Sequence, residues 1–524
     1  MKKVVIIGGG IAGLGAGIIC ARNGYETVIY EKNLIPGGCC SGWRRGDYEI
    51  DNCIHWMSGT LKNTPQYDLW KEVGALSDDM KLIKRDAFYS SEYDGKTATL
   101  WRDIERTRKE LIEISPEDEK EINRFINATK LGMKVQFPKD IPWDEENAFS
   151  NKNLSLDYSA LIKTMFEYVN INLEELSKRF KHPLLQVLIS DFMNSDYESY
   201  WLPLSYSIFA SGDGELPDGG SMGVVRNMVK TFEAAGGKLY LGKPVKKINI
   251  NKKHYSSMKK IFDLKSINFY RIAKVIDKRA DGITLADNSF VQADYIICAC
   301  DLNFTFANLL KRNFMPKQLR HIYRKEKKFP LYSSFQVAFS VEGEMPEVDQ
   351  LTFECKPFLV GMKEINRICV KNYRVYGDFI APKGKTVIQV SIVQKSDDFD
   401  YWKKMHTLNT DLYEITKKNI ADKVLERIES HFPKYKGKIN ILDIWTPYTY
   451  FHRNNCYKGA YMRFITTFTS RGAFIPCDIK NLRNVFLASH WLRYPGGIPT
   501  AVTMGKVAAS RLISVDKKSK EQTD

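Results

Sequence analysis

The hydrophobic positions of this chain fall into short uninterrupted runs and longer periodic stretches, a pattern typical of an α/β protein. Residues 4–7 form an apolar run of strand type, a helical stretch continues to Asn23, and residues 27–30 form a second apolar run. Gly24 stands where the C-terminus of a helix favours a left-handed residue. The chain is therefore predicted to begin with a strand, a helix and a second strand.

The rest of the chain continues this alternation. Helical, amphipathic patterns cover residues 116–131, 156–180, 222–235, 402–432 and 500–513. Patterns of strand type cover residues 238–241, 245–250, 283–285, 295–300 and 484–489, and many such runs lie between residues 329 and 393. A basic insertion follows residue 250, and the chain from residue 514 onward is predicted to be a charged, flexible tail.

The turn between the first strand and the first helix carries a glycine fingerprint. Gly8, Gly10 and Gly13 are spaced G-x-G-x-x-G, and Glu31 directly follows the second predicted strand. In such a unit the first glycine permits the tight turn, the second lets the backbone approach a pyrophosphate, and the third allows close helix–strand packing. The helix N-terminus attracts the phosphates, and the acid accepts hydrogen bonds from a ribose. The pattern predicts a bound dinucleotide.

A secretory signal peptide is the alternative interpretation of the same residues. Lys2 and Lys3 precede an uncharged run over residues 4–21. Six glycines interrupt that run, and a second strand follows it in place of a cleavage region. The βαβ interpretation is therefore favoured.

Composition limits the remaining possibilities. The 524 residues exceed one ordinary core, so two or three domains are expected. No apolar stretch is long enough to span a bilayer, so we expect a soluble, cytoplasmic protein that at most sits on a membrane surface. The ten cysteines include no C-x-x-C pair, which predicts reduced thiols, and histidines are scarce and unclustered, which predicts that no metal is bound.

The charge of the chain is basic, with 78 Lys and Arg against 62 Asp and Glu. Part of the excess is local, because residues 251–279 contain nine Lys and Arg against two acidic residues. No nucleic-acid-binding signature accompanies this charge, so a nucleic-acid partner is not expected. A solvated basic surface is the first interpretation, and contact with anionic lipid at a membrane is the second.

Three stretches of the sequence together resemble the FAD-dependent oxidoreductases of the phytoene desaturase group. They are residues 8–59, residues 219–248 with 293–301, and residues 484–513. The group includes carotenoid desaturases, carotenoid cis–trans isomerases and retinol saturase, within a wider flavoprotein superfamily that holds the amine oxidases. The resemblance implies an α/β fold with a Rossmann-type FAD-binding domain (three-layer ββα), and an α+β substrate domain with a mixed sheet and a helical insertion.

The same resemblance implies domain boundaries and a set of cofactor contacts. The FAD-binding domain would comprise residues 1–75, 218–328 and 478–515, the substrate domain residues 76–217 and 329–477, and the tail residues 516–524. FAD is expected to contact the glycine loop, the acid after the second strand, the following loop, and the last strand–helix turn. The residues implied are Gly8, Gly10, Ala12, Gly13, Glu31, Lys32, Gly38, Val245, Gly496, Gly497, Ile498, Pro499 and Ala501. Ala501 would start a helix whose N-terminus faces the flavin and stabilises negative charge near its N1 atom.

Two departures from the family pattern bear on the chemistry. Many relatives carry a basic residue after the glycine pair at residues 37–38, where this chain has Cys39-Cys40. Amine oxidases usually carry an acid after the last strand, where this chain has Ser489-His490. The second departure favours the desaturase and saturase branch. A redox role or a covalent flavin link is conceivable for the two cysteines, but buried thiols are the favoured interpretation.

Chemistry at a C–C bond needs a group that moves a proton beside the flavin. His490, Tyr494 and His55 are the candidate catalytic residues, with Arg493 as an electrostatic partner. Loop packing, backbone hydrogen bonding and ordinary core packing are their structural alternatives. Asp301 is predicted to cap a helix over residues 302–310.

Aromatic residues are frequent in the helical insertion, and they could line a tunnel for a polyene or form an ordinary core. They are Trp143, Phe166, Tyr168, Phe180, Phe192, Tyr197, Tyr200, Trp201, Tyr206 and Phe209.

The sequence therefore predicts an FAD-dependent oxidoreductase that desaturates or saturates a C–C bond of an apolar, isoprenoid-like small-molecule substrate. The alternatives are a redox-neutral cis–trans isomerase that uses reduced FAD, an oxidase of amines or rings, and a non-catalytic flavoprotein. The electron donor or acceptor is unknown, because no second dinucleotide fingerprint is present; Gly212-Asp213-Gly214 lacks a preceding strand.

Overall fold

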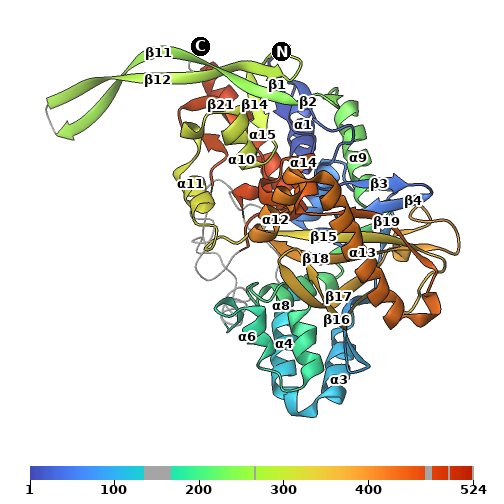
Figure 1. The fold of residues 1–524 in the computed structure, drawn as a ribbon. Coiled ribbons are helices and arrows are strands. Elements are labelled where there is room, and N and C mark those ends of the chain that lie inside the picture. The colour runs from blue at the N-terminus through green and yellow to red at the C-terminus, as the bar shows by residue number, and fades with distance from the viewer. Residues whose placement is uncertain (135–166, 265–266, 466–474, 494–495, 522–524) are drawn as a thin grey trace.

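The computed structural model describes residues 1–134, 167–264, 267–465, 475–493 and 496–521, with the backbone alone for residues 252–277 and 520. The first sheet brings together strands that are far apart in the sequence (Figure 1). Its spatial order is β10 (Lys238–Tyr240), β2 (Glu26–Tyr30), β1 (Lys3–Ile7), β14 (Tyr295–Cys298), β21 (Leu482–Leu487), β12 (Ile267–Leu285) and β11 (Val245–Leu264). Two short strands extend it, β13 (Phe290–Gln292) beside β12 and β20 (Asp478–Ile479) beside β21.

The central strands of this sheet are parallel and apolar on both faces, as expected where helices or loops cover both sides. Val4 and Ile6 pack on one face against α1 (Ile11–Arg22), α9 (Gly220–Ala234) and α15 (Gly497–Glu521). Val5 and Ile7 pack on the other face in a second core. That core also contains residues of α10 (Leu302–Phe304), η2 (Thr305–Leu309) and α11 (Lys317–Arg324). Strand β1 therefore lies at the centre of the nucleotide-binding unit.

The second sheet has the order β19 (Ile439–Trp445), β15 (Tyr332–Val341), β18 (Thr386–Lys395), β17 (Lys363–Asn372), β16 (Gln350–Val360), β7 (Ala87–Tyr93) and β8 (Lys96–Trp101). One face packs against α12 (Ser396–Leu408) and α13 (Thr410–His431). The helical insertion lies below this sheet in Figure 1. Its described helices include α3 (Ile104–Ile114), α4 (Glu119–Met133), α6 (Leu173–Ser177), α7 (Pro183–Ser190) and α8 (Trp201–Ala210).

Smaller elements connect the two units. They are the hairpin of β3 (Gly42–Arg45) and β4 (Tyr48–Asp51), the ribbon of β5 (Met57–Ser58), β9 (Gly214–Pro217) and β6 (Leu82–Ile83), and the helices α2 (Pro65–Glu72) and α14 (Pro447–Asn454). The short helical turns are η1 (Pro116–Asp118), η3 (Arg312–Phe314), η4 (Arg374–Tyr376), η5 (Pro433–Tyr435), η6 (Tyr457–Gly459) and η7 (His490–Leu492).

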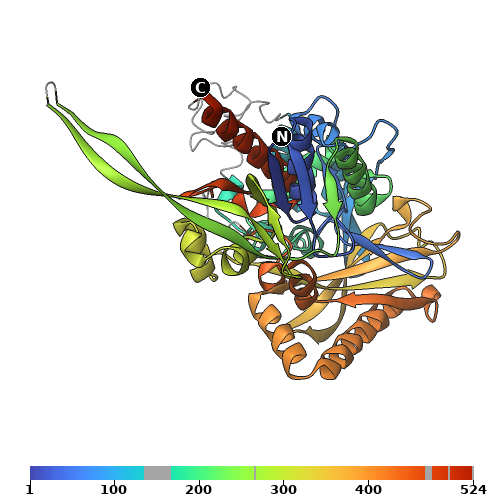
Figure 2. The same ribbon diagram turned by 90° about the horizontal axis from the view of Figure 1, so that it is seen from above.

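The basic insertion extends the sheet. Strands β11 and β12 pair antiparallel from Val245↔Leu285 to Leu264↔Ile267, and Figure 2 shows the resulting hairpin projecting from the body as a long arm. The sequence pattern predicted a strand of six residues at 245–250, followed by an insertion of unassigned structure. It missed the arm because the arm residues do not alternate regularly between apolar and polar types.

Two further predictions were wrong in detail. The helical stretch 402–432 is two helices, because Asn409 ends α12 and its side chain accepts a hydrogen bond from Leu412 N–H (2.9 Å) to start α13. The predicted tail is helical through Glu521 as part of α15. Asp516 ties this end of α15 to the first sheet, because it accepts hydrogen bonds from Tyr25 Oη (2.9 Å) and Tyr295 Oη (2.8 Å). The numbered domain boundaries stay a prediction.

Candidate active site

The glycine fingerprint lies at the carboxyl end of β1, where the chain turns into α1. Gly8 has a φ of +108°, and a Cβ on it would lie 2.8 Å from Ala299 O. A Cβ on Gly13 would lie 2.0 Å from Gly8 O, so the helix and the strand approach each other too closely for any other residue. Gly10 pairs with Gly37 of the following loop as an isolated bridge. We call the surface formed by residues 8–13, Glu31 and residues 37–38 the cradle.

The N-terminus of α1 is open to a ligand. Gly10 is its N-cap. Among the described residues, no side chain caps this end of the helix, and the first turn contains no acidic residue. The first backbone N–H groups of a helix have no partner within the helix, and they carry a partial positive charge. Ala12 lies in this first turn and is 7 % exposed. The arrangement fits a pyrophosphate, as the fingerprint predicts.

Glu31 is the acid of the cradle and is 5 % exposed. Its Oε2 accepts a hydrogen bond from Gly9 N–H (2.8 Å), and its Oε1 accepts one from Asn33 N–H (2.8 Å). A carboxylate has about four acceptor positions, so two remain for the hydroxyls of a ribose. The carboxylate therefore fixes the glycine loop and can also bind an adenosine ribose.

Val245 and Lys32 lie near this acid along the chain or through a neighbouring strand. Lys243 N–H donates to Glu31 O (2.8 Å), and Val245, which is 8 % exposed, begins β11 two residues later. Lys32 Nζ donates to His452 O (2.9 Å) and to Asn455 Oδ1 (3.2 Å). The ammonium of Lys32 thus binds the C-terminal end of α14 and its C-cap, a role the sequence pattern did not reveal.

The last strand–helix turn brings Gly496 beside His490 and Arg463. A Cβ on Gly496 would lie 3.2 Å from Arg463 Cβ and 3.8 Å from His490 Cδ2. Helix α15 begins at Gly497, so Ile498 and Pro499 lie in its first turn, and Ala501 lies one turn inside the helix instead of at its start. The helix still begins at this turn, and α15 packs along α1, with Gly505 close to Ala12 O. Tyr494 lies outside the described residues.

His490 and His55 occupy separate surroundings. His490 lies on η7, and burial followed by the charge of Arg463 lowers its pKa to about 4. His55 Nδ1 lies 3.2 Å from Tyr373 Oη, and Tyr373 Oη in turn donates to Gln389 Oε1 (2.9 Å). Burial, then Lys371 and Arg85, hold the pKa of His55 well below its ordinary value. Both imidazoles are neutral at pH 7, and both lie beside cations.

Three cations near these histidines were not predicted from the sequence: Arg463, Lys371 and Arg85. Burial lowers the pKa of Lys371 to about 8, and burial also lowers the pKa of Arg85. Arg85 is 7 % exposed and Arg463 is 2 % exposed. No local sequence motif indicates these cations, because each comes close to its histidine only in the folded chain. Acids lie near two of these cations as well, Asp51 near Lys371 and Asp349 near Arg85. The two histidines therefore lie in buried surroundings that contain charges of both signs.

The buried aromatic residues of the insertion form a hydrophobic core. Tyr206 and Phe209 have no exposed surface, and Phe88 stacks on both, with ring centroids 6.0 Å and 5.1 Å away. Tyr168 and Phe180 belong to the same cluster. Phe192, Tyr197 and Tyr200 border it, Trp201 begins α8, and Trp143 and Phe166 lie outside the described residues. The alternative of an ordinary helical core holds for the buried members.

Asp301 has the capping role predicted for it, because its Oδ1 accepts from Phe304 N–H (2.9 Å). The predicted helix over residues 302–310 is instead one short turn, α10, followed by the wider turn η2. Asp301 Oδ2 also accepts from Tyr457 N–H (3.1 Å), and burial raises the pKa of this carboxyl to about 6. Asp301 thus joins the end of β14 to the segment after α14.

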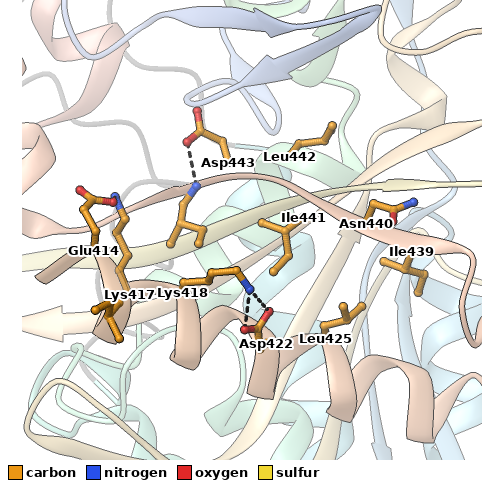
Figure 3. Close-up of a pocket in the computed structure, with 12 residues that line it drawn as sticks. Glu414, Lys417, Lys418, Asp422, Leu425, Ile439, Asn440, Ile441, Leu442 and Asp443 are labelled. Atoms are coloured by element: carbon orange, nitrogen blue, oxygen red, sulfur yellow. Dashed lines mark hydrogen bonds and ion pairs between the residues drawn. The ribbon is translucent and has the colours of Figure 1, made fainter. Parts of the chain in front are cut away.

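Two surface grooves lie outside the cradle. One, of about 720 Å³, lies between α13 and the edge strand β19, and Figure 3 shows its ion pair between Lys418 and Asp422. None of the predicted site residues lines it. The other, of about 610 Å³, is lined by Arg312, Arg320, Tyr323 and Tyr457 among others, and Tyr457 connects it to Asp301.

Comparison with known proteins agrees with this geometry. The sequence profile of the flavin-containing amine oxidoreductases matches residues 11–513. A 1-hydroxycarotenoid 3,4-desaturase of Flavobacterium sp. is 26 % identical over 261 residues, a match that covers 48 % of this chain and about half, 51 %, of that protein. A 4,4'-diaponeurosporene oxygenase of Staphylococcus aureus is 21 % identical over 99 % of this chain and 100 % of its own length.

The fold is also found in solved structures. Cyclohexylamine oxidase from Brevibacterium oxydans superposes with a TM-score of 0.57 at 12 % identity, covering 99 % of each chain. Among the described residues, no helix combines the length and the apolar character needed to cross a membrane.

Proposed function

Because the chain belongs to the family of flavin-containing amine oxidoreductases, we propose that it uses its FAD to add or remove hydrogen across a C–C bond of an apolar, isoprenoid-like polyene. FAD supplies hydride chemistry when it is bound. The cradle residues would hold its adenosine and pyrophosphate, and the turn at Gly496 would lie beside its ring.

One observation carries the choice of a C–C bond over a C–N bond. Arg463 lies beside His490, and Lys371 and Arg85 lie beside His55. An amine substrate arrives as a cation, and these three cations work against its binding, even though acids also lie near Lys371 and Arg85. A polyene carries no charge, so these cations do not oppose its binding. The similarity to a 1-hydroxycarotenoid 3,4-desaturase and to a 4,4'-diaponeurosporene oxygenase supports a polyene substrate.

The two histidines would act as neutral groups. A neutral imidazole has one N–H donor and one acceptor nitrogen, so it can hold a water. A proton that it accepts is held only briefly at pH 7, because the pKa of each ring is lowered. His490 is the first candidate because it lies at the turn next to Gly496. His55 is held by the Tyr373–Gln389 hydrogen bonds, which suits a positioning role.

The test uses the flavin as its own indicator. FAD-loaded protein is mixed without oxygen, in its oxidised form and in its dithionite-reduced form, with a C30 or C40 polyene or with a diamine. The proposal expects the polyene to bleach the oxidised flavin or to reoxidise the reduced flavin, whereas the diamine changes neither. Bleaching by the diamine alone would overturn the proposal in favour of amine oxidation.

We also propose that the protein meets its apolar substrate at an anionic membrane. The arm β11–β12 belongs to the stretch with nine Lys and Arg against two acids, and residues 311–328 add eight against one. Lys278, at the base of the arm, lies 5.1 Å from the ring centroid of Phe314, so the two basic segments are neighbours. Basic side chains near an anionic leaflet attract it.

Flotation with vesicles tests this proposal. Wild-type protein should float with phosphatidylglycerol-containing vesicles at low salt, and a variant in which a two-residue turn replaces residues 252–277 should float less. Vesicles of phosphatidylcholine alone are the control. Equal flotation with both kinds of vesicle, or with neither, would refute an electrostatic contact.

A further inference from the structure

Two cysteines that are distant in the sequence meet beside the cradle. Cys39 follows Gly37-Gly38, and Cys456 lies between α14 and η6. Their Sγ atoms are 3.4 Å apart. Cys456 is 5 % exposed, and Cys39 is the more exposed residue of the two. The contact places two thiols within reach of a disulfide bond after a small movement.

Cys456 belongs to a segment that crosses the strand ends at the cradle. We call residues 452–457 the strap. Lys32 Nζ holds its start through His452 O (2.9 Å), and Asp301 Oδ2 holds its end through Tyr457 N–H (3.1 Å). Lys32 follows β2, Cys39 lies in the loop after it, and Asp301 follows β14. The strap therefore joins two loops, the one after β2 and the one after β14, at the carboxyl edge of the sheet, where a dinucleotide binds.

Within this pair Cys39 is the more reactive thiol. The hydrogen bond from Cys456, together with one from Asn454 Nδ2 (3.6 Å), lowers the pKa of Cys39 although burial opposes the shift. Burial raises the pKa of Cys20 and of Cys477 to about 12. A thiolate is the attacking form in disulfide exchange, so Cys39 is the nucleophile and Cys456 the resolving thiol.

We propose that Cys39 and Cys456 form a reversible disulfide that fastens the strap over the bound cofactor. A low-molecular-weight disulfide, such as glutathione disulfide, is the oxidant. The Cys39 thiolate attacks one of its sulfurs, forms a mixed disulfide and releases one thiol. Cys456 then loses its proton to solvent, attacks Cys39 Sγ and releases the second thiol. Two protein thiols are oxidised and one disulfide is reduced, and excess thiol reverses both steps.

The disulfide would slow the loss of FAD. In the reduced protein the strap is held by polar contacts, which can open one at a time. A covalent bond between the strap and the loop at Gly37-Gly38 prevents these two segments from separating. We expect FAD to leave the oxidised protein at least about tenfold more slowly than the reduced protein.

The experiment uses the full-length holoprotein. It is titrated with glutathione disulfide, the intact mass is measured, and non-reduced peptides are mapped. The proposal expects the loss of two hydrogens and a peptide joining Cys39 to Cys456. A bond between other cysteines, for instance Cys40 and Cys53, or a stable glutathione adduct with no internal bond, would overturn it. This mapping needs no variant, so a folding defect cannot obscure the result.

The release of FAD is then followed by its fluorescence after dilution into mild denaturant. Oxidised wild-type protein should release FAD slowly, and excess thiol should restore fast release. Cys39→Ser and Cys456→Ser should release FAD at the reduced rate under both conditions, whereas the control Cys355→Ser should behave like the wild type. A mapped disulfide with unchanged release would overturn the fastening role. Neither readout involves a substrate, so both are independent of the proposed reaction.

Discussion

Replacing Glu31 with Gln tests the cradle. Among the described residues that form the cradle, Glu31 has the only charged side chain. In the native carboxylate, each oxygen accepts a backbone N–H, from Gly9 and from Asn33, at 2.8 Å. An amide offers one oxygen and one NH₂ group, so one of these N–H groups would face a donor. The substitution removes a charge-assisted hydrogen bond that holds the glycine loop, and it removes acceptor positions for the ribose.

The expected magnitude follows from that one bond. A hydrogen bond to a charged group contributes about 1.5–3 kcal/mol, and about 1.4 kcal/mol corresponds to tenfold in affinity, so the Kd for FAD should rise roughly 10- to 150-fold. Apoprotein is titrated with FAD, and the quenching of flavin fluorescence is recorded. Glu26→Gln is the matched control, because Glu26 begins the strand that Glu31 follows, its side chain is 43 % exposed, and it forms an ion pair with Lys3 at 3.3 Å. A Kd for Glu31→Gln within threefold of the wild type would refute the cradle.

Three further outcomes are expected. Gly13→Ala would place a Cβ 2.0 Å from Gly8 O, so we expect the purified variant to contain little FAD, as measured by its absorbance ratio. Gly15→Ala is the control and should retain FAD, because its Cβ would lie 3.2 Å from Val502 Cγ2. Equal FAD content in the two variants would contradict the close packing. Asp516→Ala removes the hydrogen bonds from Tyr25 and Tyr295, so the free energy of unfolding measured in urea should fall by about 3 kcal/mol. Glu521 is exposed, so Glu521→Gln should leave the free energy of unfolding unchanged. An unchanged free energy of unfolding in Asp516→Ala would contradict the anchored helix end. His490 has a pKa of about 4 in the folded protein, below its ordinary value near 6.5, so between these two values the unfolded chain binds one more proton than the folded chain. The free energy of unfolding should therefore fall by about 1.4 kcal/mol per pH unit from this group as the pH drops from about 6.5 to about 4. His490→Gln should remove that share of the slope in urea titrations, and an unchanged slope would show that the imidazole is not buried.

The parts of the fold that could be predicted are those that a local pattern encodes. The helix between β1 and β2, its left-handed Gly24, and the capping by Asp301 follow from a few neighbouring residues, and the structure contains all three. The family resemblance identified FAD, because its three stretches combine in one sheet.

Features that depend on distant partners could not be predicted. The end of α15 looks like a solvated tail in the sequence, and it is ordered because Asp516 reaches Tyr25 and Tyr295. In the same way, Cys39 and Cys456 are 417 positions apart, so no spacing rule connects them. Arg463 beside His490 is a third case, since a lone arginine in a loop carries no signal of its neighbour. Long-range contacts of this kind determine the charge and the reactivity of the site, and only the fold reveals them.

In the proposed reaction, the FAD of this protein changes the hydrogen content of a C–C bond. The most direct measurement is the product mass after anaerobic incubation of the holoprotein with a C30 or C40 polyene, with the flavin spectrum recorded in the same sample. We expect a product that has gained two hydrogens as reduced flavin is oxidised, or has lost two as oxidised flavin is reduced. An unchanged polyene mass with an unchanged flavin, including one with altered double-bond geometry, would contradict it.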